Sequence, residues 1–304
     1  MLKKFTKKIK KNTFFISTFF WGFHIITIFS QQAKFDHEFL GVLLLDEKSM
    51  YSYRLEFNID KDSIRGYSYT DLGGLNETKS YIYGIFNKRN NQISFEEKDV
   101  LYTKSDVGTD EFCFIKSTGK LVLKSRKNVF ESSFEGIYND GEICASGKIK
   151  VVGLKFLKKK INKTYKKIKK IKKIDSVVKE KLKPERVLNK FGKTNLSSDE
   201  IITVFMKNKK VRFQIWDYGK EDGDIVDIYI NGKKSLPNVK LKKEKKSLYI
   251  NLKKGLNKIK VTTVSAGKIK TNTAKIKIYD SSRFYELLSK IDEGKSAEIN
   301  IVIK

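Results

Sequence analysis

Residues 216–232 read WDYGKEDGDIVDIYING, and several structural signals meet in this stretch. Residues 225–230 follow the period-two pattern of a β-strand. Asn231 and Gly232 come next, and both tolerate the positive φ angles that a type I′ hairpin turn requires. The stretch therefore predicts a β-hairpin entered through an acidic loop.

The acidic side chains of this loop suggest two kinds of chemistry. Four of them are metal-ligand candidates: Asp217, Asp222, Asp224 and Asp227. Calcium prefers several carboxylate and carbonyl oxygens, and Gly219 and Gly223 let the loop fold tightly around an ion. The spacing is not that of an EF-hand. The same aspartates can instead bond nearby backbone amides and stabilise the turn. The sequence suggests calcium as its one candidate cofactor and leaves both interpretations open.

Short apolar runs continue on both sides of the hairpin, from IITVFM at residue 201 to AEINIVIK at the end of the chain. Seven to nine such runs recur at intervals of about ten residues, which is typical of a β-sandwich. The sequence predicts an Ig-like β-sandwich domain over residues 196–304.

The order of several short motifs supports this sandwich. They are Asp222-Gly223-Asp224, the strand into Tyr229-Ile230-Asn231-Gly232, residues 252–255 before Leu256-Asn257-Lys258-Ile259, and Asn272-Thr273-Ala274 before Ile276-Lys277-Ile278. In this order, residues 211–304 resemble a β-sandwich module of exported and outer-membrane-associated proteins of Bacteroidetes-type bacteria. The resemblance implies an envelope location and a sandwich architecture, and it implies no reaction.

The part of the chain before residue 153 reads as a second β domain. Nine short runs, among them SYRLEFNID, EFCFIK and KLVLKS, are separated by turn residues such as Asn90-Asn91 and Asn139-Asp140-Gly141. Glycines within the runs are typical of the bends in a barrel. An antiparallel meander or small barrel is predicted over residues 34–153. It acts either as a cup for a small ligand or as a filled barrel that serves as a spacer or protein-binding surface. The fold class is therefore all-β.

Residues 154–195 change character and predict a basic helix and linker between the two β domains. Apolar residues recur every three or four positions from Leu157 to Leu182, and Pro184 is expected to end the helix. The lysines on its other faces are candidates for contact with a polyanion or a membrane surface: Lys158, Lys159, Lys163, Lys166, Lys167, Lys169, Lys170 and Lys173. A helix of this kind can lie on an anionic membrane or can join two domains with its lysines in solvent.

The first 33 residues read as a signal peptide. Six lysines precede an uncharged apolar run over residues 13–30, followed by small and polar residues. The alternative is an uncleaved anchor, since the run approaches the length that spans a bilayer. Export to the periplasm or the outer membrane permits a disulfide, and Cys113 and Cys144 are predicted to form one. Closing this loop would stabilise the fold by roughly 3 kcal/mol.

Composition restricts the partners and the chemistry. The formal net charge of +29 predicts attraction to polyanions, and export disfavours nucleic acid among them. The only histidines are His24, within the apolar run, and His37. Serine or cysteine triads and catalytic zinc sites need fixed imidazoles, so these enzyme classes are disfavoured. Paired carboxylates such as Glu96-Glu97 or Asp110-Glu111 are the remaining catalytic candidates.

The sequence thus predicts an exported cell-envelope protein without catalytic activity. It would bind or scaffold another envelope protein or an anionic membrane or glycan surface. The alternative is a carboxylate-dependent glycan hydrolase.

Overall fold

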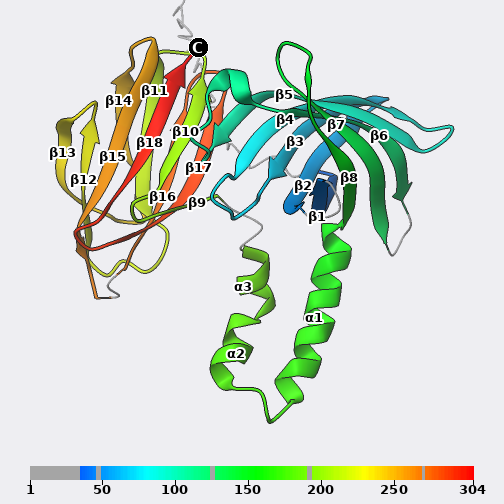
Figure 1. Ribbon diagram of the computed structural model, residues 1–304. Coiled ribbons are helices and arrows are strands. Elements are labelled where there is room, and N and C mark those ends of the chain that lie inside the picture. The colour runs from blue at the N-terminus through cyan, green and yellow to red at the C-terminus, as the bar shows by residue number, and fades with distance from the viewer. Residues whose placement is uncertain (1–34, 46–48, 124–126, 190–193, 269–270) are drawn as a thin grey trace, which may run out of the picture. The chain divides into compact units, whose positions relative to one another are not determined.

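Eight strands follow one another in the amino-terminal part of the computed structural model, which describes residues 35–45, 49–123, 127–189, 194–268 and 271–304. The predicted signal peptide, including His24, lies outside the described residues. The eight strands are β1 (His37–Leu45), β2 (Ser49–Asp60), β3 (Ser63–Thr70), β4 (Thr78–Asn87), β5 (Gln92–Thr103), β6 (Phe114–Leu123), β7 (Asn128–Ile137) and β8 (Ile143–Gly153). Each strand pairs antiparallel with the next, and β8 pairs with β1. The ring is closed, so the predicted small barrel is confirmed (Figure 1).

Large apolar side chains fill much of the barrel interior. Phe39, Tyr53, Phe57 and Phe130 are almost completely buried there. They come from strands whose inward positions alternate with outward polar ones, as a small barrel requires. The runs EFCFIK and KLVLKS, predicted as two strands, contribute to one strand, β6. Gly119 lies within it, where a β-carbon would come within 2.4 Å of the Ser132 side chain.

Ten further strands form the carboxy-terminal part of the described chain. They are β9 (Asn195–Ser197), β10 (Ile201–Met206), β11 (Lys210–Asp217), β12 (Asp224–Ile230), β13 (Lys233–Lys240), β14 (Lys246–Asn251), β15 (Gly255–Ala266), β16 (Thr271–Tyr279), β17 (Phe284–Asp292) and β18 (Ser296–Ile303). One sheet has the order β13-β12-β15-β18-β10 and the other β14-β11-β16-β17-β9. Their apolar faces share one core, which includes Phe213, Ile228 and Ile299. The all-β class is confirmed, with 62% of the described residues in strands and 12% in helices.

Strand β5 belongs to both parts of the fold. It closes the barrel against β6, and its last residues pair with β10, so that the barrel strands and one sandwich sheet form a continuous 13-stranded sheet. An irregularity at Asp99, whose φ is +61°, separates the part of β5 that lies in the barrel from the part that pairs with β10. Beyond it the side chains of Leu101 and Tyr102 join the sandwich core.

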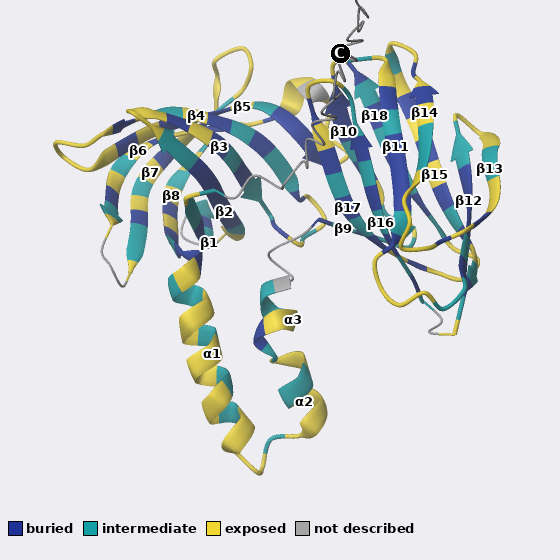
Figure 2. Cartoon of the chain, turned by 180° about the vertical axis from the view of Figure 1, so that it is seen from behind, coloured by how far each residue is buried: buried dark blue, intermediate teal, exposed yellow. Residues whose placement is uncertain are grey.

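The helical segment differs from its prediction. Instead of one helix to residue 183 it contains α1 (Leu154–Lys170), α2 (Ser176–Lys181) and α3 (Pro184–Asn189). The chain leaves helical geometry at Ile171, and Asp175 starts α2 by accepting a hydrogen bond from the backbone NH of Val177. Pro184 begins α3 rather than ending the helix, because the first helical position needs no NH donor. Figure 2 shows that most of α1 is exposed.

Candidate functional site

A cavity of about 250 Å³ opens at the barrel end that carries the β3–β4, β5–β6 and β7–β8 connections. The aromatic and aliphatic core side chains fill much of the rest of the barrel. The cavity wall is mostly apolar, and its apolar residues are Leu43, Leu45, Val100, Val107, Phe112, Phe114, Ile115, Phe134 and Ala145. The site is therefore a small apolar cup within the barrel mouth.

The β5–β6 connection forms one side of this cup and is held in two ways. Cys113 is bonded to Cys144 at the start of β8, so the predicted disulfide is confirmed. Phe112 packs edge-on against Phe205 of β10, with ring centroids 5.9 Å apart. These contacts fix the wall, and a fixed wall reduces the conformational cost of binding.

Glu97 places a carboxyl group on the apolar wall. It follows Ile93 and Phe95 at the inward positions of β5, and only 7% of its surface is exposed. The Tyr53 hydroxyl donates to Oε1 and the backbone NH of Ile115 donates to Oε2, both at 3.0 Å, and the Ser68 hydroxyl also donates. Burial raises the pKa of Glu97 despite these hydrogen bonds. Among the described residues no lysine or arginine forms an ion pair with it.

The predicted pairs of catalytic acids do not face one another across this site. Glu96 points to the outer face of β5, where it pairs with Lys98 at 2.6 Å, and Glu97 points inward. Glu111 lies on the cavity rim and accepts a hydrogen bond from the NH of Gly108. No carboxylate contributes to the raised pKa of Glu97, whereas in a closely spaced acid pair the second charge would.

The four aspartates of the acidic loop separate into two groups. Asp227 binds Lys234 Nζ at 2.7 Å and the NH of Asn238 at 2.8 Å, so both its oxygens stabilise the β12–β13 hairpin. The turn of that hairpin has φ of +49° at Asn231 and +81° at Gly232, as predicted. Asp227 therefore performs the predicted turn chemistry.

Asp217, Asp222 and Asp224 influence one another electrostatically. Burial, together with the charges of Asp222 and Asp217, raises the pKa of Asp224 to about 6. Asp224 Oδ2 accepts a hydrogen bond from the NH of Thr273, while the buried carboxylate of Asp217 accepts none from the described residues. Lys243 Nζ is the cation nearest to Asp217, at 3.8 Å. Within the described part of the chain no three His, Cys, Asp or Glu side chains form a ready metal site, and calcium stays a prediction.

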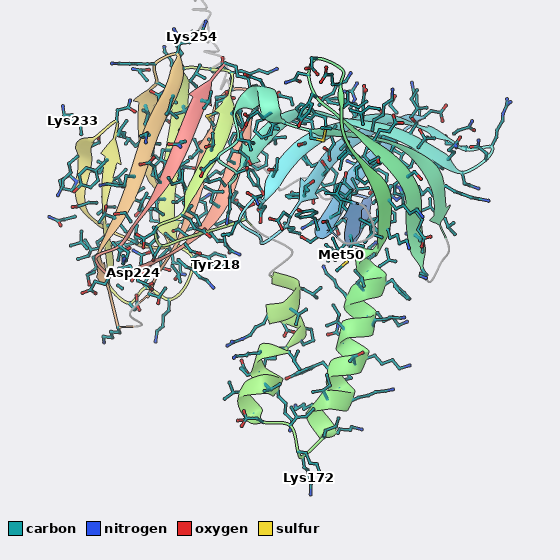
Figure 3. All side chains as sticks on the ribbon, viewed as in Figure 1. Met50, Lys172, Tyr218, Asp224, Lys233 and Lys254 are labelled. Atoms are coloured by element: carbon teal, nitrogen blue, oxygen red, sulfur yellow. A yellow bond between two sulfur atoms is a disulfide. The ribbon has the colours of Figure 1, made fainter. Side chains whose placement is uncertain are left out.

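The predicted polyanion-binding lysines are all exposed. Seven of them lie on α1, and Lys173 follows in the turn before α2. Figure 3 shows Lys172, beside it, at the tip of this helical segment. Of the apolar stripe, Leu157 packs against a small buried cluster that Leu188 of α3 also contacts, whereas Ile171 and Val178 are about half exposed. No helix among the described residues is long and apolar enough to cross a membrane.

Sequence reasoning left open whether the barrel forms a cup or is filled, and it did not single out Glu97, although one signal pointed to this residue. A glutamate at an inward position, after Ile93 and Phe95, interrupts an otherwise apolar series. Its partners Tyr53, Ser68 and Ile115 come from three other strands, and their convergence depends on barrel closure.

These features define a class of protein: a closed antiparallel barrel with a ligand-sized cup, joined through β5 to a β-sandwich. Searches of protein-family models, curated proteins and solved structures find no match to this chain.

Proposed function

We propose that this chain is a non-catalytic binding protein of the cell envelope whose barrel holds one small ligand. The observation that carries the proposal is the apolar cup with Glu97 on its wall. A buried carboxylate without a cationic partner is costly, and a ligand that supplies a hydrogen-bond donor removes part of that cost.

The chemistry of the cup defines a class of ligand. An engineered 150 Å³ cavity accepts benzene, so a cavity of about 250 Å³ has room for roughly ten non-hydrogen atoms. The apolar wall favours a hydrocarbon or aromatic body, and Glu97 favours an amino group over a hydroxyl and disfavours a carboxylate. The ligand is therefore a small amphiphile with a cationic or donor head.

The envelope location is supported by three features. The first 33 residues have the composition of a signal peptide, and the chain contains a disulfide, which persists in oxidising compartments. The resemblance of residues 211–304 to exported modules agrees with both. The exposed lysines of α1 add a surface for an anionic envelope component, and the sandwich offers a scaffold for another envelope protein.

Titration calorimetry with linear amines, alcohols and carboxylates of four to ten carbons tests the proposal. We expect amines to bind most tightly, with an optimum chain length, and carboxylates most weakly. Glu97→Gln should weaken amine binding about tenfold, because a hydrogen bond between charged groups is lost. Ala145→Trp should fill the cup and abolish binding of the whole series.

Glu96→Gln is the matched control, since its side chain points away from the cup. It should leave every affinity within twofold of wild type. If no probe binds saturably at millimolar concentration, or if Ala145→Trp binds like wild type, the cup is not a ligand site.

A further inference from the structure

The outer face of the sandwich sheet β14-β11-β16-β17 carries aromatic and cationic side chains where a solvent-facing sheet ordinarily carries mixed polar ones. Its inward positions, such as Phe213 and Ile276, are buried in the core. Beside Gln214, Ser247, Glu286 and Leu288, its outward positions hold aromatic and cationic side chains: Arg212, Trp216, Tyr249, Lys275, Lys277, Tyr279 and Phe284, with Tyr218 and Lys245 flanking them. We call this set the aromatic–cation face.

Strand register arranges this face in rows. Tyr249, Arg212, Tyr279 and Phe284 are successive partners across the four strands. The Arg212 guanidinium lies 5.4 Å from the Tyr249 ring centroid and 5.6 Å from that of Tyr279. Because Tyr249 and Tyr279 are two strands apart, their rings repeat at about 10 Å.

A second row lies four residues further along β11, at Trp216. Trp216 pairs with Lys275, whose Nζ lies 5.6 Å from the Trp216 ring and 5.9 Å from the Tyr218 ring. Lys245 Nζ approaches the Trp216 ring to 5.1 Å. Cations therefore lie beside aromatic rings in both rows.

Several of these rings are open to solvent. Tyr249 is 75% exposed, Tyr218 48% and Phe284 44%. Exposed aromatic rings on a rigid sheet lose little conformational freedom when a flat ligand stacks on them. A contiguous group of exposed apolar rings is typical of a binding surface.

The charge on this face is positive. Burial lowers the pKa of Lys277, and the neighbouring charges of Lys245 and Lys275 lower it further, while Glu286 acts in the opposite sense. Glu286 binds Lys275 Nζ at 2.6 Å. An anion placed on this face would relieve the repulsion between the lysines.

We propose that the aromatic–cation face binds an anionic polysaccharide. Pyranose rings stack on Tyr249, Phe284 and Tyr218, and acidic groups of the sugars pair with Arg212 and the lysines. The spacing of about 10 Å between the Tyr249 and Tyr279 rings, two strands apart, suits alternate units of an extended sugar chain. The disulfide, which indicates an oxidising compartment, favours a glycan over nucleic acid as the polyanion. The proposal does not depend on a ligand in the barrel.

Fluorescence provides a local readout of this face. The chain has two tryptophans, Trp21 in the predicted signal peptide and Trp216 on the face. In the Trp21→Phe protein all tryptophan emission comes from Trp216. Titration with polygalacturonate should change this emission saturably, and neutral dextran should not change it.

Affinity electrophoresis in polygalacturonate gels measures the contributions of individual side chains. Tyr249→Ala/Phe284→Ala should raise the dissociation constant at least tenfold, and Lys275→Gln/Lys277→Gln should weaken binding and reduce its salt dependence. Tyr83→Ala, which removes an exposed ring from the barrel, is the matched control and should bind like wild type.

Circular dichroism should show that all variants are folded, because the altered side chains lie outside the cores. Equal retardation of wild type and the ring variant would overturn the proposal. Tighter binding of single-stranded DNA than of polygalacturonate would also overturn it, if the same variants lose DNA binding. The face would then bind nucleic acid.

Discussion

Buried carboxyl groups in this strongly basic protein differ in how their charge is balanced. Glu97 receives three hydrogen bonds inside the barrel, and burial still raises its pKa. Asp224 accepts one from the backbone NH of Thr273 and shares another with the Asp222 side chain, and burial together with the charges of Asp222 and Asp217 raises its pKa to about 6. Asp99 differs: burial acts to raise its pKa, but hydrogen bonds from Lys304 and Arg283 hold it below the usual value.

The raised pKa of Asp224 predicts that the stability of the folded chain depends on pH. Its pKa in the folded chain, about 6, exceeds the unfolded value of about 3.9. The folded state therefore holds this proton more tightly, and its stability falls as pH rises from about 4 through about 6. Between pH 4 and pH 7, the free energy of unfolding of Asp224→Asn should therefore rise relative to that of the wild type. Allowing for solvent screening, we expect this relative rise to be about 1 kcal/mol. Urea unfolding at both pH values measures this gain, and a variant–wild-type difference that is the same at both pH values would contradict it.

Calcium binding at the same aspartates is a separate prediction. Millimolar calcium should raise the melting temperature of the wild type by neutralising Asp217, Asp222 and Asp224. Asp222→Asn/Asp224→Asn should remove the rise, and magnesium at equal concentration is the control. A wild-type melting temperature unchanged by calcium would end the metal hypothesis.

Among the elements, local patterns predicted the strands better than the helices. The alternation at residues 225–230 and the Asn231-Gly232 turn identified the β12–β13 hairpin, because both signals are local. The three-to-four spacing of apolar residues continued past Lys170, but the chain leaves helical geometry there. The Asp175 cap competes with continuation of α1, and the apolar spacing alone does not reveal that competition.

The lysines of α1 predict electrostatic binding to anionic membranes. Protein that begins at residue 34, after the predicted signal peptide, should float with vesicles containing phosphatidylserine and stay in solution with neutral vesicles. Replacing Lys158, Lys159 and Lys163 with glutamine should abolish most of this flotation, since each lysine contributes about 1 kcal/mol near the surface.

The matched control replaces three lysines on the sandwich: Lys233, Lys254 and Lys295. Figure 3 places Lys233 and Lys254 at the opposite end of the sandwich from Tyr218 and Asp224. If both triple variants float equally, net charge rather than α1 accounts for the attraction.

At the level of the whole molecule, the irregularity at Asp99 connects the barrel with the sandwich. Asp99 binds Arg283 Nη2 at 2.5 Å and Lys304 Nζ at 2.7 Å. Asp99→Asn retains a residue that tolerates positive φ but leaves the buried Arg283 without its charge partner. We expect a loss of about 2 kcal/mol in the free energy of unfolding.

Urea unfolding measures this loss, and Asp62→Asn is the control. The Asp62–Lys88 pair is about two-thirds exposed on both sides, so its loss should cost less than about 0.5 kcal/mol. Equal effects of the two substitutions would show that Asp99 does not help to hold the two β regions together.

The sequence predicted the two kinds of β region but not how they share β5 or form the cup. Alternation within residues 92–103 shows which side chains share a face, but it does not show that Leu101 and Tyr102 leave the barrel for the sandwich core. That change depends on the irregularity at Asp99 and on pairing with β10, a strand about a hundred residues away. The position of Glu97 was readable from its spacing, whereas its isolation from cations required the closed barrel.

A crystal structure of the complex with hexylamine tests the central claim most directly. We predict one amine in the barrel mouth, with its nitrogen within hydrogen-bonding distance of the Glu97 carboxylate and its chain against Phe112 and Phe134. An amine that binds only on the outer surface, or a cup that stays without hexylamine at saturating concentration, would contradict the account.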